Sequence, residues 1–193
     1  RFSISPTTGV VTFNSIPNFE APADVGTNNV YDITVSAFDG LRSSASQAVA
    51  ITVTNVLPAV TGVALTAAAN AQNNLLNAGD VIFAKVVFSE AIVLNATGGS
   101  PTLSLMIGST LVQAAYVSGS GSTDFVFSYT ILAGQDDANG ISIPSAAITL
   151  NGSTLKSVPG NSLTLGNASV ADNILYPVDT TAPSVVITSA VAS

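Results

Sequence analysis

The side chains of this sequence that could do chemistry are almost all carboxylates. The 193 residues include eleven Asp and Glu but only four Lys and Arg, and they contain no His, Cys or Trp. Nucleophilic catalysis by Ser requires a neighbouring base, which is usually His, and zinc, copper and haem sites use Cys or His. The acids fall at turns between apolar runs, where carboxylates commonly hold a hard cation such as Ca²⁺. We therefore expect no enzyme, and any metal site should use oxygen ligands alone.

Composition narrows the class of protein further. Charged residues make up 8 % of the chain and hydrophobic residues 47 %, a balance that predicts a folded domain rather than disorder. The net charge of −7 argues against a nucleic-acid partner, which would require clustered Lys and Arg. The longest apolar run, 80–94, is interrupted by Lys85 and Glu90, so no membrane span is predicted. The first residue is Arg1 and no signal pattern follows, so we expect an excerpt of a longer protein.

Apolar residues alternate with polar ones with a period of two along most of the chain. This pattern predicts half-buried strands, at about 30–37, 47–55, 81–88, 101–107 and 124–131. Gly and Pro interrupt the chain about every 8 to 15 residues, which is typical of β-sandwiches and leaves no room for crossover helices. The segment 67–77 lacks an apolar stripe and is expected to be a loop. The predicted fold class is all-β, in tandem sandwiches.

Two short Pro-containing linkers suggest domain boundaries. One surrounds Pro58 and the other surrounds Pro183, and in both a strand-like segment ends and another begins. Linkers about one domain apart are typical of tandem arrays. The expected organisation is a partial domain at 1–57, a complete domain at 58–183, and at 184–193 a linker or the first strand of another repeat.

Residues 1–57 carry four motifs in order. They are Phe2-Ser3-Ile4-Ser5-Pro6 with Thr8-Gly9-Val10-Val11-Thr12-Phe13, then Asn18-Phe19-Glu20, Tyr31-Asp32-Ile33-Thr34-Val35 and Ala37-Phe38-Asp39-Gly40. This segment resembles the C-terminal half of a cadherin-like repeat from large bacterial surface proteins. The resemblance implies that Glu20 and Asp39 are calcium ligands. The acidic linker of that family is here Asn55-Val56-Leu57-Pro58, without acids, so we expect weaker calcium binding than in a complete cadherin junction.

Residues 58–183 carry a second set of motifs. They include Asn77-Ala78-Gly79-Asp80, Val86-Val87-Phe88-Ser89-Glu90, Asp136-Asp137-Ala138-Asn139-Gly140 and Val178-Asp179-Thr180-Thr181-Ala182-Pro183. This segment resembles an immunoglobulin-like repeat of giant bacterial adhesins. The resemblance implies an extracellular, cell-surface spacer that carries a binding tip away from the cell, without an activity of its own.

The candidate Ca²⁺ ligands are Glu20, Asp24, Asp39, Glu90 and Asp179. For Glu20 and Asp39, solvated turns are an equal alternative, and Asp179 either joins Glu90 in a cation site at the end of the domain or caps a turn. Asp136 and Asp137 resemble part of an EF-hand loop but lack its spaced acids and its final Glu, so turn formation is expected there.

Two functions remain open. The first is an ion-rigidified spacer that contacts adjacent repeats of its own polypeptide. The second is a subunit of an extracellular fibre or sheath, in which a strand such as 184–192 completes the open sheet of a neighbouring copy. One strand bears on the choice. The resemblance implies that positions 82, 84, 86 and 88 point inward, which leaves Val81, Phe83 and Val87 outward and suggests a partner.

Overall fold

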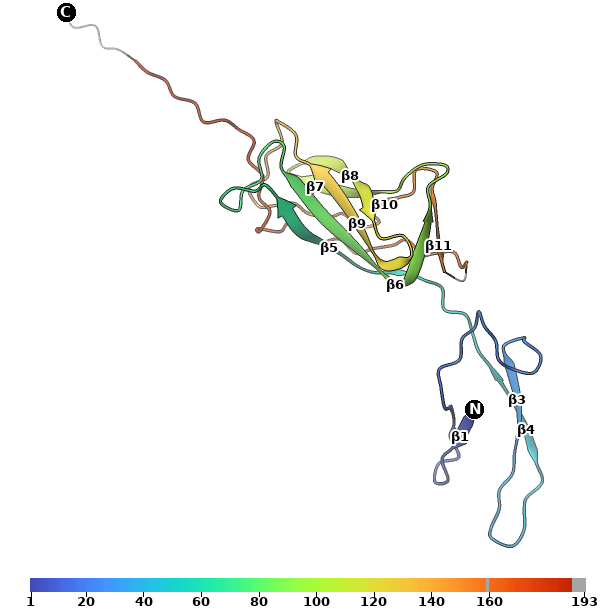
Figure 1. The fold of residues 1–193 in the computed structure, drawn as a ribbon. Coiled ribbons are helices and arrows are strands. Elements are labelled where there is room, and N and C mark those ends of the chain that lie inside the picture. The colour runs from blue at the N-terminus through green and yellow to red at the C-terminus, as the bar shows by residue number, and fades with distance from the viewer. Residues whose placement is uncertain (159, 189–193) are drawn as a thin grey trace, which may run out of the picture. The chain divides into compact units, whose positions relative to one another are not determined.

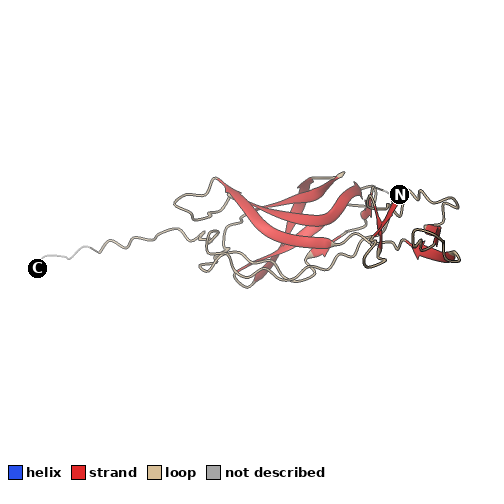
Figure 2. Cartoon of the chain, turned by 90° about the horizontal axis from the view of Figure 1, so that it is seen from below, coloured by secondary structure: helices blue, strands red, loops and turns tan. Residues whose placement is uncertain are grey.

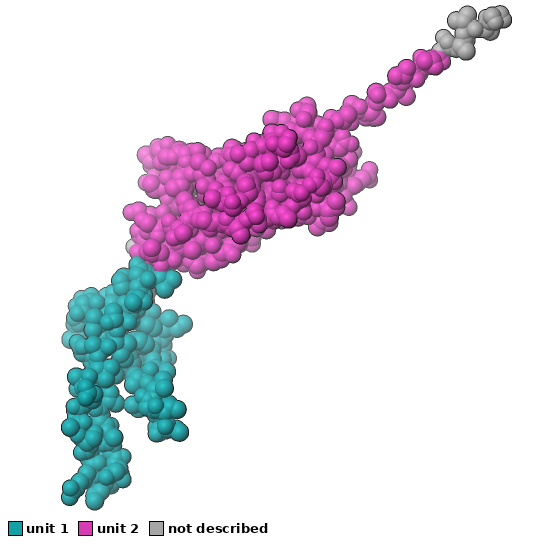
Figure 3. Space-filling view, turned by 180° about the vertical axis from the view of Figure 1, so that it is seen from behind, with its two compact units in different colours: residues 1–56 teal, residues 57–193 magenta. Residues whose placement is uncertain are grey.

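The computed structural model describes residues 1–158 and 160–188, and it is an all-β protein. Within these ranges there is no helix, which confirms the predicted fold class. None of the described residues forms a helix long and apolar enough to cross a membrane. The chain divides into two compact units, Arg1–Val56 (unit 1) and Leu57–Ser193 (unit 2), coloured separately in Figure 3.

Unit 1 consists of two antiparallel hairpins. Strands β1 (Phe2–Ile4) and β2 (Val11–Phe13) form one two-stranded sheet, and β3 (Val30–Val35) and β4 (Gln47–Thr52) form the other. The alternation of β3 places Tyr31 on the buried face, where its ring meets Phe2 and Phe13 edge-on at 5.7 and 5.1 Å between centroids. Tyr31 is the one buried hydrophobic residue found among the described residues of unit 1. Its core is therefore a single aromatic cluster.

Unit 2 is built on a seven-stranded antiparallel sheet in the order β10-β7-β8-β9-β6-β11, with β5 also paired to β6 (Figure 1). Its strands have the bounds β5 Val60–Ala69, β6 Val81–Asn95, β7 Thr102–Ile107, β8 Thr110–Ser118, β9 Ser122–Thr130, β10 Ile148–Thr149 and β11 Thr154–Ser157. The long strand β6 pairs with β9 on one side. On its other side it pairs first with β5 and then with β11.

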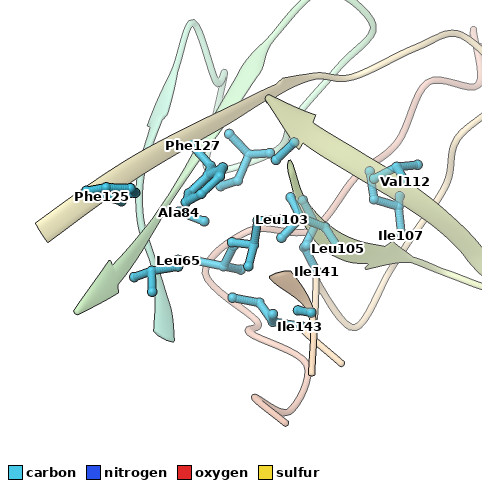
Figure 4. Packing of buried hydrophobic residues seen from close by; sticks show 14 of the residues in the cluster. Leu65, Ala84, Leu103, Leu105, Ile107, Val112, Phe125, Phe127, Ile141 and Ile143 are labelled. Atoms are coloured by element: carbon cyan, nitrogen blue, oxygen red, sulfur yellow. The ribbon is translucent and has the colours of Figure 1, made fainter. Parts of the chain in front are cut away.

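The core of unit 2 lies on one face of this sheet. The predicted inward residues Ile82, Ala84, Val86 and Phe88 are all buried, which confirms the expected alternation of β6. They pack with residues that alternate in the same way on the neighbouring strands, including Leu103, Leu105, Phe125 and Phe127 (Figure 4). Phe125 is the centre of an aromatic group, with Phe88 at 5.0 Å and Tyr116 at 5.1 Å between ring centroids.

Irregular segments form the second layer over this core. They contribute the buried residues Ile141, Ile143 and Val178, and they are joined to one another by isolated bridges rather than long ladders. These bridges pair Ile143 with Val170 and Val178 with both Leu76 and Asp137. The tan loop segments of Figure 2 run alongside the red strands of unit 2. The result is a sandwich-like arrangement with one regular and one irregular layer.

The strands differ from the sequence prediction in several places, and the short strands β1, β2, β10 and β11 were not among those expected. Strand β6 was expected to end near Phe88 but continues to Asn95, through a register shift between Val87 and Ile92. A β-bulge of this kind lets a strand bend and continue past polar residues such as Glu90. Strand β5 extends to Ala69, into the segment 67–77 expected to be a loop, and β8 was not among the expected strands.

Candidate functional site

The Asp39 carboxylate caps the turn in which it lies. Its Oδ1 accepts the backbone N–H groups of Leu41 and Arg42, at 2.9 and 2.8 Å. The next residue, Gly40, has a φ of +95°, a conformation that glycine adopts without strain. The N–H groups of Arg42 and Leu41 stabilise the ionised form and lower the pKa of Asp39 below its ordinary value. Asp39 thus organises a hairpin turn at the tip of unit 1.

Asp24 is buried and organises a second loop of unit 1. Its two carboxylate oxygens accept the backbone N–H groups of Asn28 and Asn29, at 2.9 and 3.1 Å. Burial opposes ionisation, but the N–H groups of Asn28 and Asn29 outweigh it, so the pKa of Asp24 lies below its ordinary value. The loop can therefore keep a negative charge that is only slightly exposed to solvent.

Asn29 joins this loop to the segment that carries Glu20. The Asn29 side-chain nitrogen donates to the Phe19 carbonyl at 2.9 Å, and the Glu20 backbone N–H donates to Asn18 Oδ1 at 2.9 Å. Asn29 Oδ1 is buried and has no hydrogen-bond partner among the described residues. A buried acceptor without a partner often marks the place of a water molecule or an ion. The segments 18–20 and 24–29 therefore bring carboxylate, side-chain amide and backbone carbonyl oxygens into one region of unit 1.

The two remaining candidates lie in different parts of unit 2. Asp179 caps its own turn through the Thr181 N–H at 2.9 Å, and its backbone N–H donates to the Leu76 carbonyl, just before β6 begins. Glu90 lies in the second half of β6, where the adjacent Ser89 N–H donates to the Ala59 carbonyl. The sequence interpretation that joined Glu90 and Asp179 in one site at the end of the domain is therefore not supported by their placement.

Within residues 1–158 and 160–188, no group of three or more acids is placed to hold a metal ion. A closed Ca²⁺ site uses six to eight oxygen ligands, with carboxylates prominent among them. The acidic residues alone do not meet that requirement in either unit. Any calcium site would need backbone carbonyl, amide or water oxygens, for which the surroundings of Asn29 are the best candidate.

The carboxylates of Asp136 and Asp137 organise the end of unit 2. The buried Asp137 accepts the N–H groups of Gly140 at 3.0 Å and of Gly108 at 2.7 Å. Asp136 accepts the Thr180 N–H at 2.7 Å and the Thr181 hydroxyl at 2.9 Å. The bond to Gly140 confirms the expected turn-forming role for Asp137, whereas the Asp136 carboxylate bonds to the distant Thr180 and Thr181. The structure adds bonds to distant segments, for which the sequence spacing gave no signal.

Unit 1 also carries open apolar surface along its second hairpin. A groove of about 520 Å³ runs between the turn after β1 and the outer ends of β3 and β4. Its lining contains no charged residue: Ile4, Ser5, Pro6, Gly9, Val35, Ser36, Ala37, Phe38, Ser44, Ala45 and Gln47. A second hollow of about 400 Å³ lies over 32–34 and 48–50. The second hollow includes the charged Asp32, whereas the uncharged groove beside a two-stranded sheet is suited to additional polypeptide rather than to a polar substrate.

The outward face of β6 is mostly apolar but not fully exposed. Val81, Phe83 and Val87, which were expected to point outward, are half-buried. Between them Lys85 forms an ion pair with Asp124 of β9 at 3.0 Å, with both side chains partly exposed. A partly exposed pair of this kind contributes little to stability.

In both units, therefore, carboxylates hold the loops in place by accepting backbone N–H groups, and the sheets between these loops are mostly apolar. Comparisons of the chain with protein-family models, with curated proteins and with solved structures found no match.

Proposed function

We propose that this chain is a non-catalytic structural module, a repeat segment of a large bacterial surface adhesin that acts as a spacer outside the cell. The observation that carries the proposal is the chain path through unit 2. The unit starts where Val60 pairs with Phe88 and ends where the Asp179 N–H binds the Leu76 carbonyl, beside the start of β6. The strand Val81–Phe88 separates these points by about 25 Å, at roughly 3.3 Å per residue.

A module whose two ends lie far apart lengthens a polypeptide each time it is repeated. In Figure 1 the chain reaches unit 2 near β11 and leaves it beyond the far end of β5. Asp137 and Asp136 fasten the last segment to the unit, so the exit point is well defined. These features support a role in setting distance, the role that the resemblance to adhesin repeats implies.

The proposal includes rigidification by Ca²⁺ in unit 1, around Glu20, Asp24 and Asn29, with Asp39 as a further candidate. The unpaired Asn29 Oδ1 and the oxygen-only donors support this assignment. Calcium would here order loops that the small aromatic core does not fix. We expect weak binding, because the described acids do not converge as a set of three.

The spacer function can be tested in a reporter adhesin. One, two or three copies of residues 1–183 are placed between a membrane anchor and a known binding tip, and the reach of the tip is measured by single-molecule force spectroscopy. We expect the reach to increase by a constant step per copy, and the purified chain alone to bind no cell or matrix surface. Saturable binding of the purified chain to such a surface would contradict the proposal.

A second candidate function is that of a fibre subunit assembled by strand addition. Two observations favour it: the uncharged groove of unit 1, and the exposed apolar run Val185-Val186-Ile187. In that function the strand 184–192 of one copy would cover the open sheet of the next, although residues 189–193 lie outside the described part of the chain. Neither the groove nor the segment 184–192 contains a charged residue, so their contact would bury no charged side chain.

Sedimentation velocity over a range of concentrations separates the two functions. A spacer remains monomeric with or without residues 184–193. A fibre subunit forms assemblies that grow with concentration and are lost when these residues are deleted, and this outcome would replace the spacer by the fibre. The substitution Val186→Asp in the full-length chain provides a control that keeps the chain length unchanged.

A further inference from the structure

The last fastened segment of unit 2, residues 176–181, is inserted between two neighbouring segments, and we call it the exit strap. On one side the Leu76 N–H donates to the Pro177 carbonyl and the Asp179 N–H donates to the Leu76 carbonyl, both at 2.9 Å. On the other side Asp137 and Val178 exchange backbone hydrogen bonds of 2.7 and 2.8 Å. Val178 is buried, so backbone pairing and packing both hold the centre of the exit strap.

The end of the exit strap is held in a different way. Thr180 and Thr181 are attached through the side chain of Asp136, whose Oδ1 accepts the Thr180 N–H at 2.7 Å and whose Oδ2 accepts the Thr181 hydroxyl at 2.9 Å. The Thr180 hydroxyl in turn accepts the Gly134 N–H at 2.8 Å. A few residues further on, Val185, Val186 and Ile187 are more than four-fifths exposed. The Asp136 contact is therefore the last point of attachment before the chain becomes exposed.

The chemistry of the contact suits an ionised carboxylate. An ionised Asp has two acceptor oxygens and no donor, so it can receive a backbone N–H and a hydroxyl at the same time without conflict. Hydrogen bonds to a charged acceptor are stronger than those between neutral groups. Alanine at this position would remove the acceptor of the Thr180 N–H and of the Thr181 hydroxyl, whereas the pairing of Val178 with Asp137 and Leu76 uses backbone groups alone.

We propose that the Asp136 carboxylate is a latch that sets where unit 2 ends and the free linker begins. With the latch closed, Thr180 and Thr181 belong to the unit. With it open, the linker begins after Asp179 and is longer by these two residues, about 7 Å of extended chain. The biological role of the latch rests on the proposed spacer function, because the latch would set how stiffly unit 2 is joined to the segment that follows it. Its physical test does not depend on that function.

The test is amide hydrogen exchange of the full-length chain at neutral pH, read at Thr180 by NMR, with Val178 as the internal reference. For Asp136→Ala we expect exchange at Thr180 to accelerate by about tenfold or more, the effect of losing a hydrogen bond to a charged group. Val178, whose backbone bonds to Asp137 are retained, should stay protected. Thr181→Val, which removes only the hydroxyl and keeps the shape, should accelerate exchange at Thr180 by a smaller factor.

Asp124→Asn is the matched control, because it removes one negative charge on the outer face of the sheet, away from the exit strap. It should leave exchange at Thr180 unchanged. The latch is refuted if Asp136→Ala does not alter Thr180. It is equally refuted if Val178 loses its protection and exchanges as fast as Thr180, since Asp136 would then hold the whole exit strap. Either result leaves the spacer function standing, because reach is measured separately.

Discussion

The buried carboxylate of Asp137 accepts the backbone N–H of Gly108 at 2.7 Å, which joins two turns 29 residues apart in the sequence. The same carboxylate accepts the Gly140 N–H through its other oxygen. One side chain therefore fixes the turn between β7 and β8 to the irregular layer that covers the core. Through its backbone it also pairs with Val178 of the exit strap.

The first prediction concerns this carboxylate. Asp137→Ala should lower the free energy of unfolding of unit 2 by about 1–3 kcal/mol, because it leaves the Gly108 and Gly140 N–H groups without an acceptor. Urea unfolding monitored by circular dichroism measures the change. The exposed Asp172 provides the control, and Asp172→Asn should change the free energy by less than about 0.5 kcal/mol. Equal effects of the two substitutions would contradict the prediction.

The second prediction concerns a close approach of two loops. A Cβ atom on Gly98 would lie 2.3 Å from the carbonyl oxygen of Gly152, a contact that backbone must shift to relieve. Gly98→Ala should therefore destabilise unit 2 by about 1–3 kcal/mol. Gly62 is the matched control, because its φ is also not positive and a Cβ there meets Val87 at an ordinary 4.0 Å. Gly62→Ala should be neutral or slightly stabilising. Thermal unfolding of both variants and the wild type measures these changes.

The third prediction concerns the unequal cores of the two units. Unit 1 depends on Tyr31 with Phe2 and Phe13, whereas unit 2 has a large buried cluster. We expect two calorimetric transitions, with unit 1 unfolding first. Tyr31→Ala should abolish the lower transition and leave the upper one in place, while Phe38→Ala, at a side chain that is 69 % exposed, should preserve both. A single transition shifted as a whole by Tyr31→Ala would show that the units unfold together.

The fourth prediction concerns pH. The Thr180 N–H and then the Thr181 hydroxyl bind the ionised form of Asp136 and lower its pKa below the ordinary value of 3.8. A group with a lowered pKa in the folded state stabilises the fold above its unfolded pKa, and this contribution is lost as the pH falls through the folded pKa. The melting temperatures of the wild type and Asp136→Ala should therefore differ by a constant amount between pH 7 and about 5 and converge below 3.8. A difference that persists at pH 2 would contradict this.

The fifth prediction concerns calcium. Addition of Ca²⁺ at about 10⁻⁴ to 10⁻³ M, the range of extracellular modules, should raise the melting temperature of unit 1, and EDTA should reverse the effect. Asn29→Ala, which removes the unpaired buried oxygen, should reduce the shift. Asp172→Asn in unit 2 should leave it unchanged. A melting temperature that does not respond to EDTA in the wild-type chain counts against any ion site in this region.

The sequence predicted strands β6, β7 and β9 of the regular layer because strand alternation is a local property, but β8, β10 and β11 were not among the expected strands. For 81–88 the resemblance implied the inward positions, and these are buried. The extension of β6 past Glu90 could not be predicted in the same way, because the bulge there interrupts the alternation, and its neighbours β5 and β11 come from distant parts of the chain. Tertiary pairing decided that boundary.

The functional groups were harder to predict than the strands. The sequence singled out acids by their position in turns, and Asp39 and Asp24 do cap turns. The partners of Asp136 lie more than 40 residues away in the chain, a separation at which spacing contains no information about contact. The same limitation applies to Asp179, for which a site shared with Glu90 and a capped turn were equal alternatives, and the structure shows the capped turn.

The irregular layer of unit 2 has a consequence for how copies of such a module could diverge. Its segments are joined by single bridges, such as Ile143 with Val170, rather than by a ladder whose register a one-residue insertion would reverse. Doubling the length of a loop costs only about 0.6 kcal/mol of closure entropy. Homologous copies can therefore gain or lose residues after β11, between 160 and 169, while the sheet keeps its register. Differences in length between copies should therefore be concentrated in the irregular layer. A tag or epitope inserted there should disturb folding less than one inserted in the sheet.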